Sequence, residues 1–244
     1  ERATPPIAAK DVECLAALRS PDDLKLSLYR AARAQPGEGA LRFKLYRQHS
    51  DIPLSDALPM MENMGLRVIS EHPFRIELAD DDGNMVPVYI QDFEVEAARV
   101  DSRQLDLDVS RLDADFEDAF EQIWRGNAEN DGFNRLILAA GLTWRQVAML
   151  RGYMKYLLQV GVPFSQAYVE ETFARYPLLV RLLVELFEAR FDPSTGSESK
   201  AQIAEGAERF AQQLANLAGG DKDTINALAP VIETRRQGRG AQYD

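Results

Sequence analysis

The chain has 244 residues, 45% of them apolar and 27% charged, which is typical of globular domains and unlike disordered or membrane-spanning chains. Its formal net charge of -11 repels nucleic-acid phosphates and anionic lipids, so neither nucleic acid nor a membrane is expected as a partner. One cysteine allows no internal disulfide and no cysteine-built zinc site, and without a bilayer-length apolar run or a secretory signal the expected location is the cytoplasm.

Residues 1–20 carry little pattern and are treated as an N-terminal flank. Residues 21–100 predict a mixed α/β module, because short stretches that alternate apolar and polar residues surround one helical segment. The first two stretches are LKLSLYR, from Leu24, and LRFKLYR, from Leu41. The segment between them contains proline and glycine and is predicted to be a loop.

A helix is predicted in LSDALPMMENMGL, where Ser55 is placed to cap the N-terminus, Asp56 suits the positive end of the helix dipole and Gly65 ends the helix. Two more strands are predicted in RVISEHPFRIEL and VPVYIQDFEVEA. Asp82 and Gly83 between them are typical of a hairpin turn. The predicted fold class is therefore α+β, with a small α/β sandwich first.

After Val100 the pattern becomes helical. Residues 101–193 are predicted to form an all-helical module, residues 194–236 further helices or a connector, and residues 237–244 a disordered tail. Thr143 and Gln146 have the spacing of a capping box. Helices are expected over 113–125, 133–140, from 143 to about 160, over 166–190 with a break near Pro177, and around 203–217.

A search for chemistry finds no catalytic, cofactor-binding or metal-binding residue. A phosphate-binding turn needs glycines between a strand and a helix, but PGEGALRF leads into a strand. No G-x-S-x-G motif occurs, and neither His49 nor His72 has a partner at metal-ligand spacing. The polar stretch WRGNAENDGFNRLIL favours helix caps and backbone hydrogen bonds, although a binding role stays open.

Two long blocks resemble a known family. They are LSDALPMMENMGLRVISEHPFRI with VYIQDFEVE downstream, and FEDAFEQIWRGNAENDGFNRLILAAGLTWRQVAMLRGYMKYLLQVGVPFSQAYVEETFARYP with ELFEARFDP downstream. Both are similar to the large NAD-specific glutamate dehydrogenases of bacteria, over most of residues 40 to 193. The resemblance implies an ACT-like, ferredoxin-like module and a helical connector that precede the catalytic domain, in a parent enzyme that uses NAD and belongs to a much longer chain.

The leading hypothesis is therefore a non-catalytic regulatory or assembly segment of such an NAD-dependent enzyme, with no cofactor of its own. The expected partners are other domains of the same chain, further copies in a homo-oligomer, and an amino-acid effector. The alternatives are a pure oligomerisation scaffold without an effector, and a small self-contained enzyme whose catalytic residues the sequence does not reveal. The candidate effector or interface residues are Ser55, Asp56, Asn63, Gly65 and Arg67.

Overall fold

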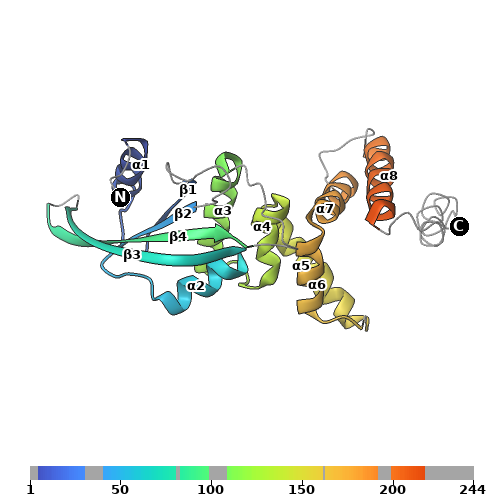
Figure 1. Ribbon diagram of the computed structural model, residues 1–244, viewed down its shortest axis with the longest axis horizontal. Coiled ribbons are helices and arrows are strands. Elements are labelled where there is room, and N and C mark those ends of the chain that lie inside the picture. Colours follow the sequence, from blue (N-terminus) through green and yellow to red (C-terminus); the bar gives the residue numbers. More distant parts are fainter. Residues whose placement is uncertain are drawn as a thin grey trace, which may run out of the picture. The chain divides into compact units, whose positions relative to one another are not determined.

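The computed structural model describes residues 5–30, 41–80, 83–98, 109–161, 163–191 and 199–217, and the chain divides into two compact units (Figure 1). Unit 1 comprises residues 1–175 and unit 2 residues 176–244. In chain order, unit 1 contains α1 (Pro5–Ala16), β1 (Leu24–Arg30), β2 (Leu41–Gln48), α2 (Leu54–Asn63), β3 (Leu66–Ala79), β4 (Met85–Ala97), α3 (Val109–Trp124), the 3-10 helix η1 (Gly132–Asn134), α4 (Arg135–Ala140), α5 (Trp144–Gln159) and α6 (Gln166–Arg175). Unit 2 contains α7 (Pro177–Phe191) and α8 (Ser199–Leu217).

The four strands form one antiparallel sheet in the order β1-β2-β4-β3. In a β-α-β-β-α-β unit a strand follows the second helix. In this chain α3 is followed by further helices. The strand that completes the four-stranded sheet is β1, which precedes β2 in the chain. The predicted α+β class, with an ACT-like sheet followed by helices, is confirmed. The predicted Asp82 lies outside the described residues, whereas Gly83 has the positive φ of 84° that a tight turn requires.

The sheet has two different faces, because successive side chains in a strand point to opposite sides. Phe43 and Phe93 are paired across β2 and β4, and both are fully buried on the face that α2 and α3 cover. The ring of Phe43 makes edge contacts with Phe116 and Phe120 of α3, with ring centroids 5.3 and 5.1 Å apart. This aromatic group is the centre of the core on that face.

The other face is covered by α1, which lies across the sheet from α2 (Figure 1). Cys14 of α1 and Leu18, two residues beyond the end of α1, pack against Tyr46 and Val88 of the sheet. This helix, within the N-terminal flank, was not predicted from the sequence. Its apolar stripe is only about one turn long, which is too short for periodicity to reveal.

The two edge strands of the sheet, β1 and β3, differ in how their backbone N–H groups are satisfied. At the β1 edge, the backbone N–H of Leu28 donates to Oε1 of Glu117 in α3 at 3.1 Å, so a helix side chain takes up a hydrogen bond that another strand would otherwise make. At the β3 edge lies Pro73, and proline is tolerated there because an edge strand needs fewer N–H donors. At the β1 edge, one N–H is thus bonded within this chain.

Local sequence signals fix the helical part of unit 1. The capping box of Thr143 and Gln146 is present, and Gly141 ends α4 in the left-handed region with φ 60°. The predicted break near Pro177 is confirmed, since α6 ends at Arg175 and α7 begins at Pro177.

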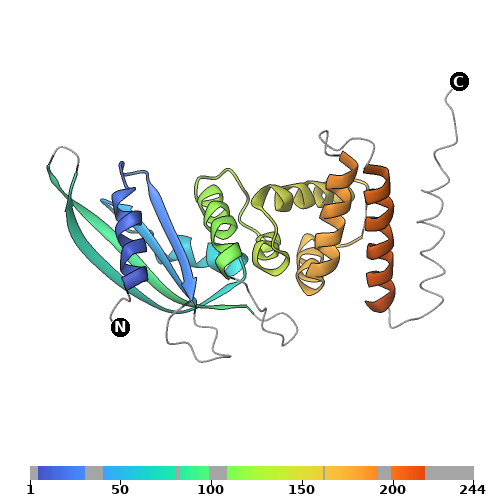
Figure 2. The ribbon, with the colours of Figure 1, turned by 90° about the horizontal axis from the view of Figure 1, so that it is seen from above.

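Unit 2 consists, among its described residues, of two helices that lie side by side (Figure 2). A Cβ built on Gly206 of α8 would lie 3.6 Å from Cδ1 of Leu186 in α7. Arg209 also pairs with Glu185 at 3.5 Å. The helix predicted around residues 203–217 is therefore present, whereas the predicted tail at 237–244 lies outside the described residues.

The core predicts a clear contrast between two phenylalanines. Phe43→Ala is expected to lower the free energy of unfolding by about 3–5 kcal/mol, because it empties a closed aromatic site. Phe74→Ala is the matched control, since the Phe74 side chain is 53% exposed on β3, and it is expected to cost less than about 1 kcal/mol. Urea unfolding followed by circular dichroism measures both. Equal losses would contradict this placement of the core.

Candidate functional site

The predicted residues at the start of α2 are exposed. The helix begins at Leu54, with Pro53 in the N-cap position and no side-chain cap, so the prediction that Ser55 caps it is wrong. The extended backbone of Pro53 starts the helix early and places Ser55 inside the first turn. There its hydroxyl donates to Oδ1 of Asp56 at 3.3 Å, and both side chains lie on the surface.

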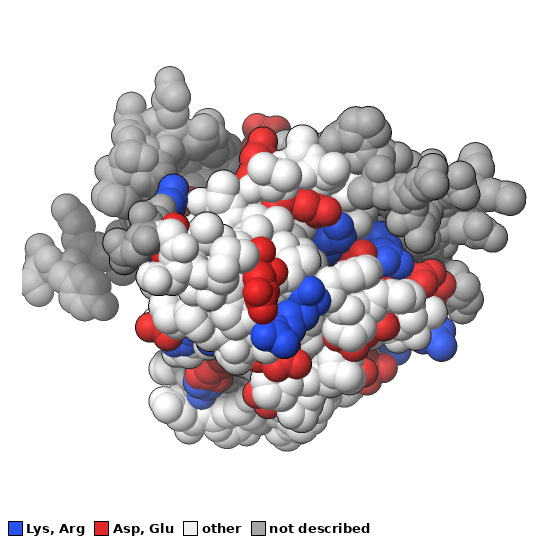
Figure 3. Space-filling model, turned by 90° about the vertical axis from the view of Figure 1, so that its left-hand side faces the viewer, with Lys and Arg blue, Asp and Glu red and all other residues white. Residues whose placement is uncertain are grey.

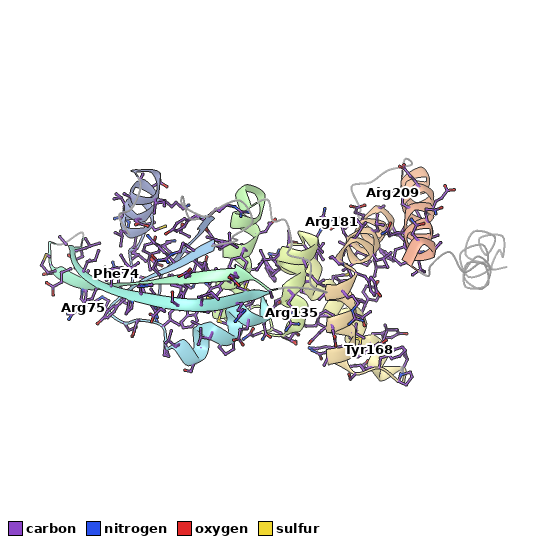
Figure 4. The ribbon with its side chains drawn as sticks, viewed as in Figure 1. Phe74, Arg75, Arg135, Tyr168, Arg181 and Arg209 are labelled. Atoms are coloured by element: carbon purple, nitrogen blue, oxygen red, sulfur yellow. The ribbon has the colours of Figure 1, made fainter. Side chains whose placement is uncertain are left out.

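The predicted residues at the end of α2 lie where the sheet meets the helices of unit 1. Nδ2 of Asn63 donates to Oδ1 of Asn130 at 3.0 Å. Gly65 has φ 85°, and a Cβ in its place would lie 3.7 Å from Cγ of Arg135, which Figure 4 labels at the start of α4. Arg67, on β3, is exposed. The five candidates thus fall into two groups at opposite ends of a helix of ten residues, which is about 15 Å long.

A polar cluster that the sequence did not reveal holds α1 to the sheet. Nζ of Lys44 lies 2.9 Å from both carboxylate oxygens of Asp11, and the hydroxyl of Tyr46 donates to Oδ1 of Asp11 at 2.6 Å. Lys44 and Tyr46 are buried. Asp11 was inconspicuous because its partners are more than 30 residues away in the sequence.

The pKa values of Lys44 and Tyr46 are both raised, as expected for a structural contact. Burial is the largest single cause and lowers the pKa of Lys44, but the hydrogen bond to Asp11 and the nearby Tyr29, Asp11 and Asp92 together leave the pKa above its usual value. Burial and the bond to Asp11 both raise the pKa of Tyr46. A lysine nucleophile needs a lowered pKa. Lys44 and Tyr46 therefore keep their protons at neutral pH.

A second ion pair lies next to this cluster on the same face. Arg42 binds both oxygens of Asp92, at 3.0 and 2.8 Å, and NH1 of Arg42 lies 3.9 Å from Glu94. The hydrogen bond to Asp92 raises the pKa of Arg42. Burial, followed by the charge of Asp92, raises the pKa of Tyr29. Each of the two cations, Lys44 and Arg42, is thus bound to a carboxylate of this chain.

The polar stretch noted in the sequence is organised by Arg151 of α5. Its guanidinium binds both carboxylate oxygens of Asp131, at 2.6 and 2.7 Å, and NH2 also donates to Oδ1 of Asn134 at 2.9 Å. Oδ1 of Asp131 in turn accepts the backbone N–H of Phe133, which caps η1. Only 5% of the Arg151 side chain is exposed. The pair therefore joins η1 to α5.

The helix α6 approaches the same cluster very closely. A Cβ built on Gly132 would lie 2.5 Å from Oε2 of Glu170, so any other residue here would require the Glu170 side chain to move. Nε2 of Gln166 donates to Oε1 of Glu170 at 2.8 Å and lies 3.4 Å from Oδ2 of Asp131. The sequence predicted caps in this stretch, but it could not indicate the partners in α5 and α6.

A hollow of about 410 Å³ lies between α1 and the ends of two strands. Most of its lining is aliphatic, and the amide of Gln48 already donates to the carbonyl oxygen of Leu18 at 3.3 Å. None of the five predicted residues lines it. Its lining residues are Val12, Leu15, Ala16, Leu18, Arg19, Gln48, Leu78, Ala79 and Asp80.

The reactive side chains considered in the sequence lie apart from one another. Cys14 is buried, burial raises the pKa of its thiol, and the thiol lies 3.7 Å from the carbonyl oxygen of Leu26. His49 and His72 are exposed. In the described part of the chain, His, Cys, Asp and Glu form no group of three or more suited to a metal ion. None of the helices described there is both long and apolar enough to cross a bilayer.

The face shown in Figure 3 presents basic and acidic side chains next to each other among uncharged ones. No single sign of charge dominates that view. A ligand of high charge therefore finds no uniform field on this face.

Comparison with known proteins gives a consistent result along the chain. Residues 23–109 match the family described as glutamate dehydrogenase, ACT3 domain, and residues 128–193 match glutamate dehydrogenase, helical motif 3. Relatives named NAD-specific glutamate dehydrogenase are 42% identical over 187 residues in Halomonas elongata, 37% over 228 in Pseudomonas aeruginosa and 37% over 183 in Mycobacterium tuberculosis. These matches cover 77%, 93% and 74% of this chain, but only 11%, 13% and 11% of the relatives.

The Arg151 cluster predicts a large effect of one small substitution. Asp131→Asn is expected to lower the free energy of unfolding by about 3 kcal/mol, because it removes the carboxylate bound to a buried guanidinium and leaves only the half-exposed Glu129, 3.8 Å away. Arg175→Ala, which removes an exposed pair with Glu171, is the control and is expected to cost at most about 0.5 kcal/mol. Urea unfolding measures both, and similar effects would show that the Arg151 pair is not a buried constraint.

The α1 contact predicts a loss of stability at high pH. The folded pKa values of Lys44 and Tyr46 lie above their usual 10.5 and 10.0, so in that range the folded chain keeps protons that the unfolded chain releases. The stabilisation is complete below about pH 10 and falls as pH rises, by up to about 1.4 kcal/mol per pH unit for each group.

Unfolding free energies at about pH 9 and about pH 11 test this expectation. The decrease is expected to be smaller in the double variant Lys44→Met with Tyr46→Phe than in the unmodified chain. An identical decrease in both would mean that other groups cause the alkaline loss.

Proposed function

We infer that this chain, which belongs to the family of large NAD-specific glutamate dehydrogenases, serves its parent enzyme as a non-catalytic regulatory or assembly segment. The parent enzyme uses NAD and water to oxidise L-glutamate to 2-oxoglutarate and ammonium, with release of NADH, in the cytoplasm. The segment itself holds no cofactor in this proposal. Its partners are the other domains of the parent chain and further copies in a homo-oligomer.

One observation carries the non-catalytic part of this proposal. The buried charged groups described above are bound to one another, as Lys44 is to Asp11, Arg42 to Asp92 and Arg151 to Asp131. Each pair joins two separate elements of unit 1. The pKa of Lys44 is raised, whereas catalysis by a lysine needs it lowered. These ion pairs therefore support a structural role better than a catalytic one.

The regulatory part rests on the joint between the sheet and the helices. Asn63 and Gly65 contact Asn130 and Arg135 there, so an amino-acid effector bound beside this turn would act on both modules. Ser55, Asp56 and Arg67 are exposed and are proposed as contacts with a neighbouring domain or subunit. The alternative is a pure oligomerisation scaffold, in which all five residues serve contacts and no effector binds.

Kinetics of the parent enzyme test the proposal. The double variant Lys44→Met with Tyr46→Phe is expected to leave kcat and KM for glutamate within about twofold of the unmodified enzyme, because an effect on chemistry would require contact with the reacting atoms. Absorbance of NADH gives the rates, and circular dichroism confirms that the variant is folded. A folded variant whose kcat falls by about a hundredfold or more would place this cluster in the catalytic machinery.

An amino-acid panel separates regulation from scaffolding. In the regulatory case one amino acid raises the melting temperature of the parent enzyme, and Asn63→Ala weakens that shift while Glu171→Ala, remote from the joint, does not. If no amino acid shifts the melting temperature or the rate, the scaffold alternative holds.

A further inference from the structure

The end of α5 after Met154 is unusual because its apolar side chains are exposed. Val147, Leu150 and Met154 form the buried side of this helix. Beyond Met154, none of residues 155–160 is buried, although the sequence YLLQV is largely apolar. A helix end in water normally carries polar residues on its outer faces. This helix end carries a surface that unit 1 does not bury.

Six exposed apolar residues lie in the second half of α5 and around the start of α6. Tyr153, Tyr156, Leu157 and Val160 follow the i, i+3, i+4, i+7 spacing of a single helix face, which borders the buried face at Leu157. At the start of α6, the rings of Phe164 and Tyr168 are stacked with centroids 5.3 Å apart (Figure 4 labels Tyr168). All six side chains are between 42% and 60% exposed. We call the six residues, Tyr153, Tyr156, Leu157, Val160, Phe164 and Tyr168, the hairpin stripe.

The stripe is not simply part of a generally exposed helix. Lys155 and Gln159 occupy a third, polar face of the same two turns, and Lys155 pairs with Glu129. The apolar residues are therefore segregated from the polar ones within the exposed part of α5. Such segregation is typical of a helix that lies between two packed surfaces.

We propose that the hairpin stripe docks against a part of the same full-length dehydrogenase that lies outside residues 1–244. This inference rests on the proposed function, since it takes the parent to be a longer enzyme of this family. The matched relatives extend far beyond the region that this chain covers, which is 11 to 13% of their length. Most of the surface that could cover the stripe therefore lies outside this chain.

The size of the hairpin stripe favours docking against a neighbouring domain over docking against the same stripe on a second copy of the chain. Six half-exposed side chains of this kind offer roughly 500 Å² of surface. A stable dimer interface needs about 800 Å² from each partner. A contact between domains of one chain is stable with less, because covalent linkage keeps the two surfaces at high effective concentration.

Photo-crosslinking of the full-length enzyme tests the proposal. Tyr156 is replaced by the photoreactive amino acid p-benzoylphenylalanine, and Gln159, on the polar face of the same turns, is replaced in a control protein. After irradiation, mass spectrometry is expected to identify peptides from outside residues 1–244 joined to position 156, with about tenfold lower yield from position 159. Crosslinks to another hairpin stripe, to other residues of 1–244, or to no peptide would overturn the proposal.

A second measurement does not depend on crosslinking chemistry. The double variant Tyr156→Ser with Val160→Ser is expected to raise amide hydrogen exchange in residues 155–168 of the full-length enzyme by about tenfold, because the docked state loses apolar contacts. Gln159→Ser controls for the lower helix propensity of serine and is expected to change exchange far less. Equal effects of the two changes would contradict docking through the stripe.

Glutamate-dependent NADH formation, measured on the same preparations, keeps this inference separate from the proposed function. An active enzyme without crosslinks to outside peptides would overturn the docking surface alone. Outside crosslinks in an enzyme that forms no NADH from glutamate would overturn the proposed function alone.

Discussion

The packing of α3 against Phe43 is the contact on which the rest of unit 1 depends. Phe116 and Phe120 close the core on one face of the sheet, and Glu117 of the same helix takes up an N–H at the β1 edge. The helix α3 also contacts α4 and α5. One helix therefore packs against the sheet and also contacts the helices that follow it in unit 1.

The buried charged groups also join separate elements of unit 1. Burial of a charge is costly unless the charge is paired and hydrogen-bonded. In unit 1 each such charge has its partner on a different element: Lys44 joins β2 to α1, and Arg151 joins α5 to the turn before η1. Breaking such a pair costs far more than making it gains, so these residues specify the arrangement of elements. That role agrees with a segment that transmits or supports contacts within a larger enzyme.

The comparison of sequence with structure shows which physical signals are local. The strands at Leu24 and Leu41, and the capping box at Thr143, were predictable because their patterns lie within a few residues. The helix at Pro5–Ala16 was missed, since only a short stripe contacts the sheet.

The candidate site was less predictable than the fold. Ser55 was a reasonable cap by residue type, but Pro53 sets the helix start. Asp11 and Arg151 have partners 33 and 20 residues away, and no local pattern reveals such pairs. The central claim, that this segment lies outside the catalytic machinery, is tested most directly by NADH formation from glutamate and NAD. The full-length enzyme is predicted to be active and the folded 244-residue chain inactive, whereas turnover by that chain alone would contradict the claim.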